Sequence, residues 1–224
     1  MVVEIPHNAV TSVEPDGGQW HYRVTCVEFG CGGVVYQGTK PTNEEAEQAA
    51  VTASGIHTQL CTDMVLVRPL IIHRDYERLA YLLGNEGFMA SFGGPLAKEK
   101  VAGYLAEMRN RCMAFPYAEQ LVVARSTGII VSIVGARRLG PTVDFTWRTD
   151  PHPDHRRKGY AEEGSRQLLK LWDEREGGVI FARIGISNQP SRRLATCKLG
   201  FVRVELVTED EFHRQLYQRD VEST

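Results

Sequence analysis

Apolar and polar residues follow two different periods along the chain, and the changes of period predict its secondary structure. Two stretches rich in residues that favour strands, separated by a glycine-containing bend, predict a β-hairpin at 20–37. Alanines then recur at helical spacing over 42–57, where Thr42 or Asn43 is suited to cap the first turn. The stretch before the hairpin, 1–17, shows little pattern beyond prolines and glycines, so we expect a loose lead-in. The N-terminal part therefore predicts a small ββα module.

From residue 62 the chain alternates between runs with the period of a strand and runs with the period of a helix. The expected strands are 63–70, 120–124, 129–135, 142–147, 178–186 and 201–207. The expected helices are 75–83, one from Pro95 to Cys112, one that begins close to Arg157 and includes Trp172, 190–199, and a charged helix at 208–219. Up to residue 207 this order is β-α-α-β-β-β-α-β-α-β.

The connection before the helix that includes Trp172 is the most informative stretch of the chain. Two prolines keep the approach extended, and Gly159 has no Cβ that could obstruct a ligand. A helix start presents unpaired backbone N–H groups and partial positive charge, to which Arg156, Arg157 and Lys158 add three cations. Successive N–H groups in such a turn can form an anion-binding nest. This combination predicts a site for a pyrophosphate.

The spacing of residues 156–161, Arg-x-x-Gly-x-Ala, resembles the loop that binds the pyrophosphate of acetyl-CoA in the GNAT superfamily of N-acetyltransferases. A second motif at 188–194 and 198–201 resembles the Asn-x-x-Ser-x-Arg and Lys-Leu-Gly-Phe sequences of the branch that acetylates ribosomal-protein alanine. The order of elements is also that of the superfamily, so the resemblance covers 62–207. It implies an α+β fold, a GNAT-like mixed and mostly antiparallel twisted sheet flanked by helices, preceded by the ββα module.

The resemblance also implies a donor site and catalytic groups. It assigns acetyl-CoA, as the acyl donor, to a set drawn from both motifs: Arg156, Arg157, Lys158, Gly159, Tyr160, Ala161 and Asn188. The oxyanion donor would be a backbone N–H at about 147–150, in the strand before the loop. Where many members have a tyrosine general acid this chain has Ala195, so Ser191 is the expected acid. Asn188 and Ser191 lie at a helix start, however, where both residue types also serve as caps.

The general base and the acceptor side are less constrained by the sequence. Asp144 lies in the strand before the loop and could activate the amine directly or through water, although an exposed strand carboxylate without function fits equally. Asp150 and His152 are further candidates, but turn formation explains the first and solvent exposure explains the second. The superfamily usually adds another strand where a charged helix is expected here, so we expect a remodelled acceptor side.

The N-terminal module contains residue types that bind zinc. Its candidate ligands lie at a hairpin bend and a helix end, where small zinc modules place them: Cys26, Cys31, His57 and Cys61. The gap in the middle of this set is longer than in a zinc finger with two cysteines and two histidines, and His21 could replace one ligand. The alternative is that these are unliganded packing residues. The odd total of five cysteines, without a secretion signal, argues against a disulfide framework.

Composition and charge limit the classes of function and the partners that fit this chain. The chain of 224 residues is 42% hydrophobic and 24% charged, with a net charge of −2, and we divide it into a module at 1–61 and a domain at 62–224. Its basic residues cluster locally, which makes nucleic acid an unfavoured partner, and no apolar run approaches the length of a membrane span. We therefore expect a cytoplasmic location.

These patterns predict an acetyl-CoA-dependent N-acetyltransferase that acts on a primary amine of a small molecule or a protein N-terminus. Two alternatives stay open. One is an acyltransferase on nucleic acid or aminoacyl-tRNA, with the ββα module as its docking element. The other is a non-catalytic acetyl-CoA-binding module. The sequence also leaves a homodimer open.

Overall fold

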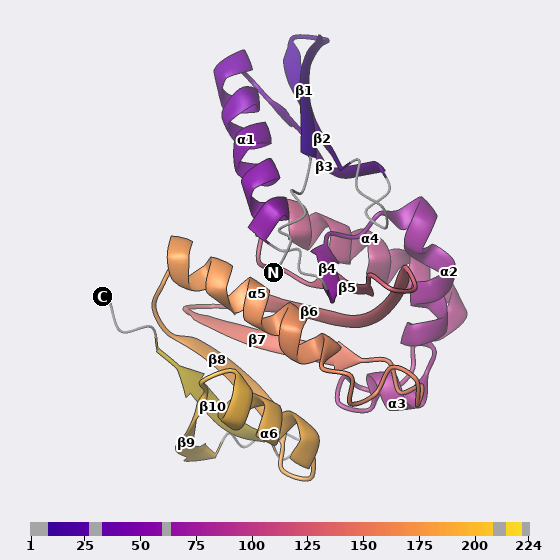
Figure 1. Ribbon diagram of the computed structural model, residues 1–224, viewed down its shortest axis with the longest axis vertical. Helices are drawn as coiled ribbons and strands as arrows, with labels where there is room; N and C mark the ends of the chain where they lie inside the picture. Colours follow the sequence, from indigo (N-terminus) through magenta and orange to yellow (C-terminus); the bar gives the residue numbers. More distant parts are fainter. Residues whose placement is uncertain (1–8, 27–32, 60–63, 208–213, 221–224) are drawn as a thin grey trace, which may run out of the picture.

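The computed structural model describes residues 9–26, 33–59, 64–207 and 214–220 of the chain. Its strands form two separate sheets, one of three strands and one of seven. Figure 1 shows the smaller sheet with one helix at one end of the molecule, beside the larger sheet, which carries helices on both faces. Within the described residues no helix is both long and apolar enough to cross a membrane.

The smaller sheet is an antiparallel meander of β1 (Ala9–Asp16), β2 (Gln19–Cys26) and β3 (Gly33–Lys40). β2 and β3 confirm the predicted hairpin, whereas the expectation of a loose lead-in was wrong for β1. Gly17 and Gly18 have φ angles of 56° and 85° and join β1 to β2 in a two-residue turn, whose geometry suits the twist of a hairpin. The adjacent glycines are the signal that could have predicted β1.

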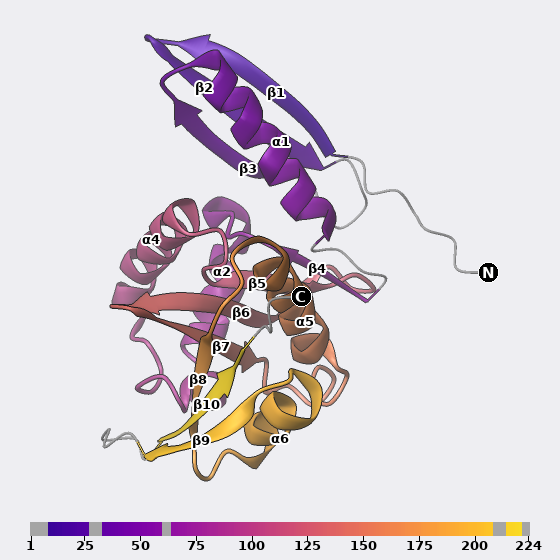
Figure 2. The same cartoon turned by 90° about the vertical axis from the view of Figure 1, so that its left-hand side faces the viewer.

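Helix α1 (Asn43–Gln59) packs across one face of this sheet (Figure 2). Thr42 caps it, because Thr42 Oγ1 accepts a hydrogen bond from the Glu45 N–H (3.2 Å) and the Glu45 carboxylate accepts one from the Thr42 N–H (3.3 Å). Over the part of the helix whose side chains are described, the buried residues are small, which lets it lie close to the strands: Ala46, Ala50 and Ala53. Two of these alanines share one hydrophobic cluster with Val24 of β2 and with residues of the larger unit.

The larger sheet is built from β4 (Val65–Arg68), β5 (Gln120–Ala124), β6 (Ile129–Leu139), β7 (Thr142–Thr149), β8 (Ile180–Gly185), β9 (Val202–Val207) and β10 (Arg214–Arg219). Their order across the sheet is β4-β5-β6-β7-β8-β10-β9. Neighbouring strands are antiparallel except β7 and β8, which are parallel. The parallel pairing comprises one register pair, Asp144 opposite Phe181, and β7 then continues to Thr149 alongside β6 alone. The two strands therefore part where the site is expected.

Helices cover both faces of this sheet (Figures 1 and 2). One face carries α2 (Ile72–Leu83), α3 (Glu86–Met89) and α4 (Lys98–Ala114), and the other carries α5 (Tyr160–Arg175) and α6 (Gln189–Lys198). A separate buried cluster lies under each face, with Leu79 and Leu105 in one and Leu168, Trp172 and Leu199 in the other. This arrangement confirms the predicted α+β class and the mixed, mostly antiparallel sheet.

Two helices between β4 and β5 differ from the prediction. Pro95 does not start a helix, because residues 95–97 stay extended and α4 begins at Lys98 after Ala97, whose ψ is 142°. The short helix α3 was not predicted. Its start is fixed by Asn85, whose side-chain oxygen accepts a hydrogen bond from the Phe88 N–H (3.1 Å).

The expectation of a charged helix at 208–219 was wrong over its described part. Residues 208–213 lie outside the described residues, but 214–219 form β10, which is inserted between β8 and β9. Gln215, Leu216 and Tyr217 are buried there, and pairing on both sides outweighs the weak helical preference of a charged run. The chain thus has the further strand that is usual in the superfamily, although the charged sequence of this stretch had predicted a helix.

Candidate active site

The connection between β7 and α5 has the backbone of an anion-binding turn. Arg157 has a φ of 60°, which is uncommon for a residue with a side chain, and Gly159 at the N-cap of α5 has a φ of 83°. Left-handed residues within a turn direct successive N–H groups toward one point, and no side chain caps the start of α5. The side chains of Arg156, Arg157 and Lys158 are exposed, and no ion pair within the described residues involves them. The turn can therefore offer both N–H groups and cations to a phosphate.

Asp150 anchors this turn to the sheet. Its carboxylate is fully buried and accepts hydrogen bonds from the His152 N–H (3.0 Å), from His155 Nδ1 (2.6 Å) and from Arg78 of α2. Arg78 also donates to the Ile130 carbonyl of β6 (3.0 and 3.1 Å). Burial alone would raise the pKa of Asp150, but these donors outweigh it and lower that pKa below its usual value. An ionised, fully engaged carboxylate is suited to fixing the loop rather than to accepting a proton.

The Asp150 backbone is engaged as well. Its N–H donates to the Val131 carbonyl (2.9 Å), so this N–H cannot serve as the oxyanion donor expected near the end of β7. The N–H of Arg148 also faces β6, because N–H groups two residues apart in a strand point to the same side. The candidates within the expected range are then the N–H groups of residues 147 and 149. His152 is exposed, as the sequence suggested, and its ring lies 5.4 Å from that of His155.

The second motif meets β7 at the start of α6. Asn188 caps α6, because its side-chain oxygen accepts a hydrogen bond from the Ser191 N–H (3.2 Å). The Ser191 hydroxyl oxygen accepts a hydrogen bond from the indole N–H of Trp147 (3.1 Å), and the Ser191 side chain is half-buried. The capping role proposed for Asn188 is therefore present in the structure. The Ser191 hydroxyl instead bonds the side chain of Trp147, one of the β7 residues whose backbone N–H is a candidate oxyanion donor.

Asp144 lies on the opposite face of β7 from Trp147, because side chains alternate along a strand. Its carboxylate is 5% exposed and is bound by Arg183 of β8, on the sheet face that carries α2 and α4. One of its oxygens has no hydrogen-bond partner among the described residues. The structure thus places Ser191 on the sheet face that carries α5 and α6, whereas Asp144 lies on the other face, at the point where β7 and β8 still pair. The two predicted catalytic side chains are not brought together.

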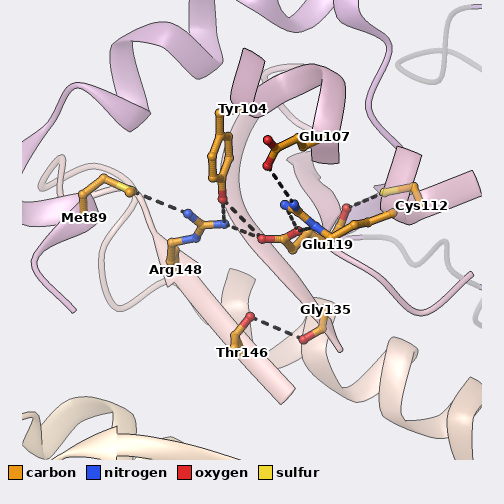
Figure 3. Close-up of polar contacts among 9 residues, drawn as sticks. Met89, Tyr104, Glu107, Cys112, Glu119, Gly135, Thr146 and Arg148 are labelled. Carbon is orange, nitrogen blue, oxygen red and sulfur yellow. Dashed lines mark hydrogen bonds and ion pairs between the residues drawn. The ribbon is translucent and has the colours of Figure 1, made fainter. Parts of the chain in front are cut away.

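A buried polar cluster on the Asp144 face was not anticipated from the sequence (Figure 3). Arg148 is 4% exposed and donates to Tyr104 Oη of α4 (3.0 Å) and to a carboxylate oxygen of Glu119 (3.1 Å). The other carboxylate oxygen of Glu119 accepts two bonds from Arg111 (2.6 and 2.9 Å), and the Phe92 ring covers the Arg148 guanidinium at 4.6 Å. The one available signal was the row of polar residues on alternate positions of β7. The cluster ties β7 to α4.

The zinc prediction falls mostly on residues that the structure does not describe. Cys31 and Cys61 lie outside the described residues. Cys26 closes β2 and His57 lies in α1, but their side chains are also outside the description. Among the side chains that are described, no group of three or more His, Cys, Asp or Glu residues could hold a metal ion. The zinc site therefore stays a prediction.

Comparison with known proteins identifies the family to which this fold and site correspond. Residues 65–202 match the family model of the acetyltransferase (GNAT) domain. No curated protein matches the sequence. An acetyltransferase structure from Agrobacterium tumefaciens is similar with a TM-score of 0.60 at 18% identity, over 71% of this chain and 92% of that one.

Two further solved structures contain ligands. The microcin self-immunity acetyltransferase MccE, in complex with acetyl-CoA and AMP, has a TM-score of 0.60 at 12% identity, over 71% of this chain and 93% of that one. The ribosomal alpha-N-protein acetyltransferase RimL, in complex with coenzyme A, has a TM-score of 0.59 at 14% identity, over 72% and 97%. At these identities the likeness establishes a shared fold.

Proposed function

The chain belongs to the family of acetyltransferase (GNAT) domains, and we propose that this acetyl-CoA-dependent N-acetyltransferase holds its donor on the 156–161 turn and acetylates a primary amine of a small molecule or a protein N-terminus. The observation that carries the proposal is the backbone of that turn. Left-handed Arg157 and Gly159 stand at an uncapped helix start beside three exposed cations. Strain of this kind persists where the surrounding structure imposes it, commonly at a ligand site.

The reaction needs three kinds of group. The unprotonated amine attacks the thioester carbon, so the carbonyl oxygen acquires negative charge that an N–H group must stabilise. Here the backbone N–H groups of residues 147 and 149, in β7, are the proposed donors. The bond to sulfur then breaks, and the sulfur leaves more readily if it receives a proton.

Ser191 is the proposed proton donor to the sulfur. Its oxygen already accepts the indole N–H of Trp147, and no described residue accepts the hydroxyl proton in turn. The proton is therefore free for a ligand. Ala195, which occupies the position of the tyrosine in other members, is fully buried in the core, so it leaves no competing acid at that position.

Asp144 is the proposed base. One of its carboxylate oxygens has no hydrogen-bond partner among the described residues, so an acceptor amine or a water could use it, whereas the other oxygen is bound to Arg183. The same face carries Arg148 and Glu119, whose charges compensate each other. RimL is by its name a ribosomal alpha-N-protein acetyltransferase, and a protein N-terminus is accordingly among the proposed acceptors for this chain.

The Ser191 assignment is tested by the Ser191→Ala variant. Loss of the proton donor should lower turnover by roughly 10²–10⁴-fold while acetyl-CoA affinity stays close to that of the parent, because the group acts chiefly in the transition state. Thr196→Ala is a matched control in α6, since the Thr196 hydroxyl bonds only within the helix, to the Arg192 carbonyl (3.0 Å) and against Cys197. Parent-like turnover of Ser191→Ala, measured on a sample of unchanged melting temperature, would exclude the assignment.

The division into a module at 1–61 and a domain at 62–224, the zinc site and the cytoplasmic location remain proposals from the sequence. The presence of two separate sheets supports the division. Metal analysis of protein purified without chelator tests the zinc site directly, because a closed thiolate site retains its metal.

A further inference from the structure

We propose that Trp147 is a positioning residue that fixes the Ser191 hydroxyl so that its proton points at the sulfur of the donor. The inference rests on the proposed function, because it assigns a partner to the proposed acid. The two side chains come from β7 and α6, which are far apart in the sequence, and Trp147 Nε1 lies 3.1 Å from Ser191 Oγ.

The chemistry of the two groups determines which atom donates. An indole nitrogen can only donate a hydrogen bond, so the serine oxygen must be the acceptor and its own proton must point elsewhere. A serine in a helix commonly returns its proton to the carbonyl four residues back, as Thr196 does in this same helix. Ser191 makes no such bond among the described residues, and it stands in the first turn of α6. Its proton is therefore available to a ligand.

The indole itself is held by aromatic packing. Its ring lies 6.1 Å from the Phe145 ring and 6.5 Å from the Phe201 ring, and both phenylalanines are 2% exposed. Phe201 follows directly after α6, and its N–H donates to the Ala195 carbonyl (3.0 Å). The motif that begins near Ser191 thus ends in the residue that supports Trp147. The segment 191–201 therefore supplies both the proposed acid, Ser191, and Phe201, which packs against the indole that orients this acid.

The bond also assists the proton transfer. As the carbon–nitrogen bond forms and the carbon–sulfur bond breaks, the sulfur takes the Ser191 proton, and the serine oxygen regains one from the newly formed, still protonated amide nitrogen through water. Negative charge on Oγ between these steps is stabilised by the indole N–H, which makes the hydroxyl a better acid. No co-reactant beyond the amine, the thioester and water is required.

A double-mutant cycle tests the inference. Trp147→Phe keeps most of the ring and removes the N–H, so kcat should fall about 10–100-fold, as for loss of a hydrogen bond to a group that becomes charged. The KM for acetyl-CoA should change by less than about 3-fold, since the bond is not part of donor binding. In the Ser191→Ala background the same change should have little further effect. A role of Trp147 in packing alone predicts an equal loss in both backgrounds.

The matched control is Trp172→Phe. Trp172 belongs to the buried cluster against which Trp147 packs, but its buried indole nitrogen has no hydrogen-bond partner among the described residues, so this variant should keep the parent kcat. Thiol release from acetyl-CoA is followed with a set of short peptides that carry free N-terminal amines as acceptors, and melting temperature is measured on each sample.

A second readout does not depend on turnover. In the nitrogen–proton spectrum of the parent, the Trp147 indole signal should shift and its hydrogen exchange should accelerate on Ser191→Ala, while the Trp172 signal stays in place. An unmoved Trp147 signal, or additive losses in the cycle, would overturn the inference alone. Parent-like turnover of Ser191→Ala would overturn both the inference and the assignment of the acid on which it rests.

Discussion

At the scale of single residues, Asp150 holds the donor turn to the sheet by a buried charge. Three donors surround its carboxylate, and they lower its pKa against the opposing effect of burial. A carboxyl group with a lowered folded-state pKa contributes stability above its unfolded pKa of about 3.9. That contribution is lost as the pH falls through the lower folded-state pKa. The stability of the loop anchor is therefore full at neutral pH and disappears only in strong acid.

Asp150→Asn should then destabilise the protein at pH 7 by about 2–3 kcal/mol, because Arg78 is left without its buried partner. The difference from the parent should shrink as the pH falls through the lowered folded-state pKa of Asp150, because the parent carboxyl then becomes protonated. Denaturant unfolding over a series of pH values from neutral to strongly acidic measures this. Asp173→Asn is the control, since the Asp173–Arg219 pair is about one-fifth exposed and should cost less. An Asp150 effect that is independent of pH would contradict the account.

At the scale of elements, the turns and helix caps that were predicted correctly from the sequence depend on residues that are close together in the chain. The turn at 156–161 and the cap at Asn188 depend on residues a few positions apart, and both are found where they were expected. The Arg148–Glu119 contact joins β7 to the start of β5 and depends on tertiary packing. The pattern of residues within one short stretch does not tell which buried polar side chains from distant parts of the chain will contact each other. The same limit explains β10, whose two neighbouring strands outweigh its charged sequence.

The cap of α1 is a local device whose effect can be measured. Thr42→Ala should cost about 1 kcal/mol of stability, because it removes half of a reciprocal pair of hydrogen bonds at the helix start. Thr52→Ala, in the middle of the same helix, should cost nothing or stabilise slightly, since its hydroxyl accepts only a long bond from Gln48 (3.4 Å) and alanine favours a helix. Equal losses from the two variants, in free energies of unfolding, would show that Thr42 does not act as the cap.

At the scale of the whole molecule, the N-terminal unit is joined to the catalytic domain by shared apolar packing. Val24, Ala50 and Ala53 belong to the cluster that contains Leu66 and Leu79. The junction is not filled throughout, because a cavity of about 800 Å³ lies between α1 and the connection from β4 to α2. We therefore expect the two units to unfold together, with the junction less tightly packed than the core of the larger unit.

Val24→Ala tests this coupling. Removing two buried methyl groups should lower the free energy of unfolding by about 2 kcal/mol. In a Trp20→Phe background, where Trp147 and Trp172 of the larger domain report by fluorescence, one transition should shift as a unit. An early transition confined to the N-terminal unit, with the tryptophan signal unchanged, would show that the shared cluster does not couple the two units.

The central claim is that the turn before α5 binds acetyl-CoA, and calorimetric titration of acetyl-CoA tests it most directly. The parent should bind, and Gly159→Val should bind about 5–150-fold more weakly, because a branched side chain at a φ of 83° costs roughly 1–3 kcal/mol in the geometry that presents the N–H groups. Gly128→Val imposes comparable strain at a φ of 70° in the turn between β5 and β6 and should leave the affinity unchanged. Equal affinity of the parent and Gly159→Val, or no binding by the parent, would contradict the account.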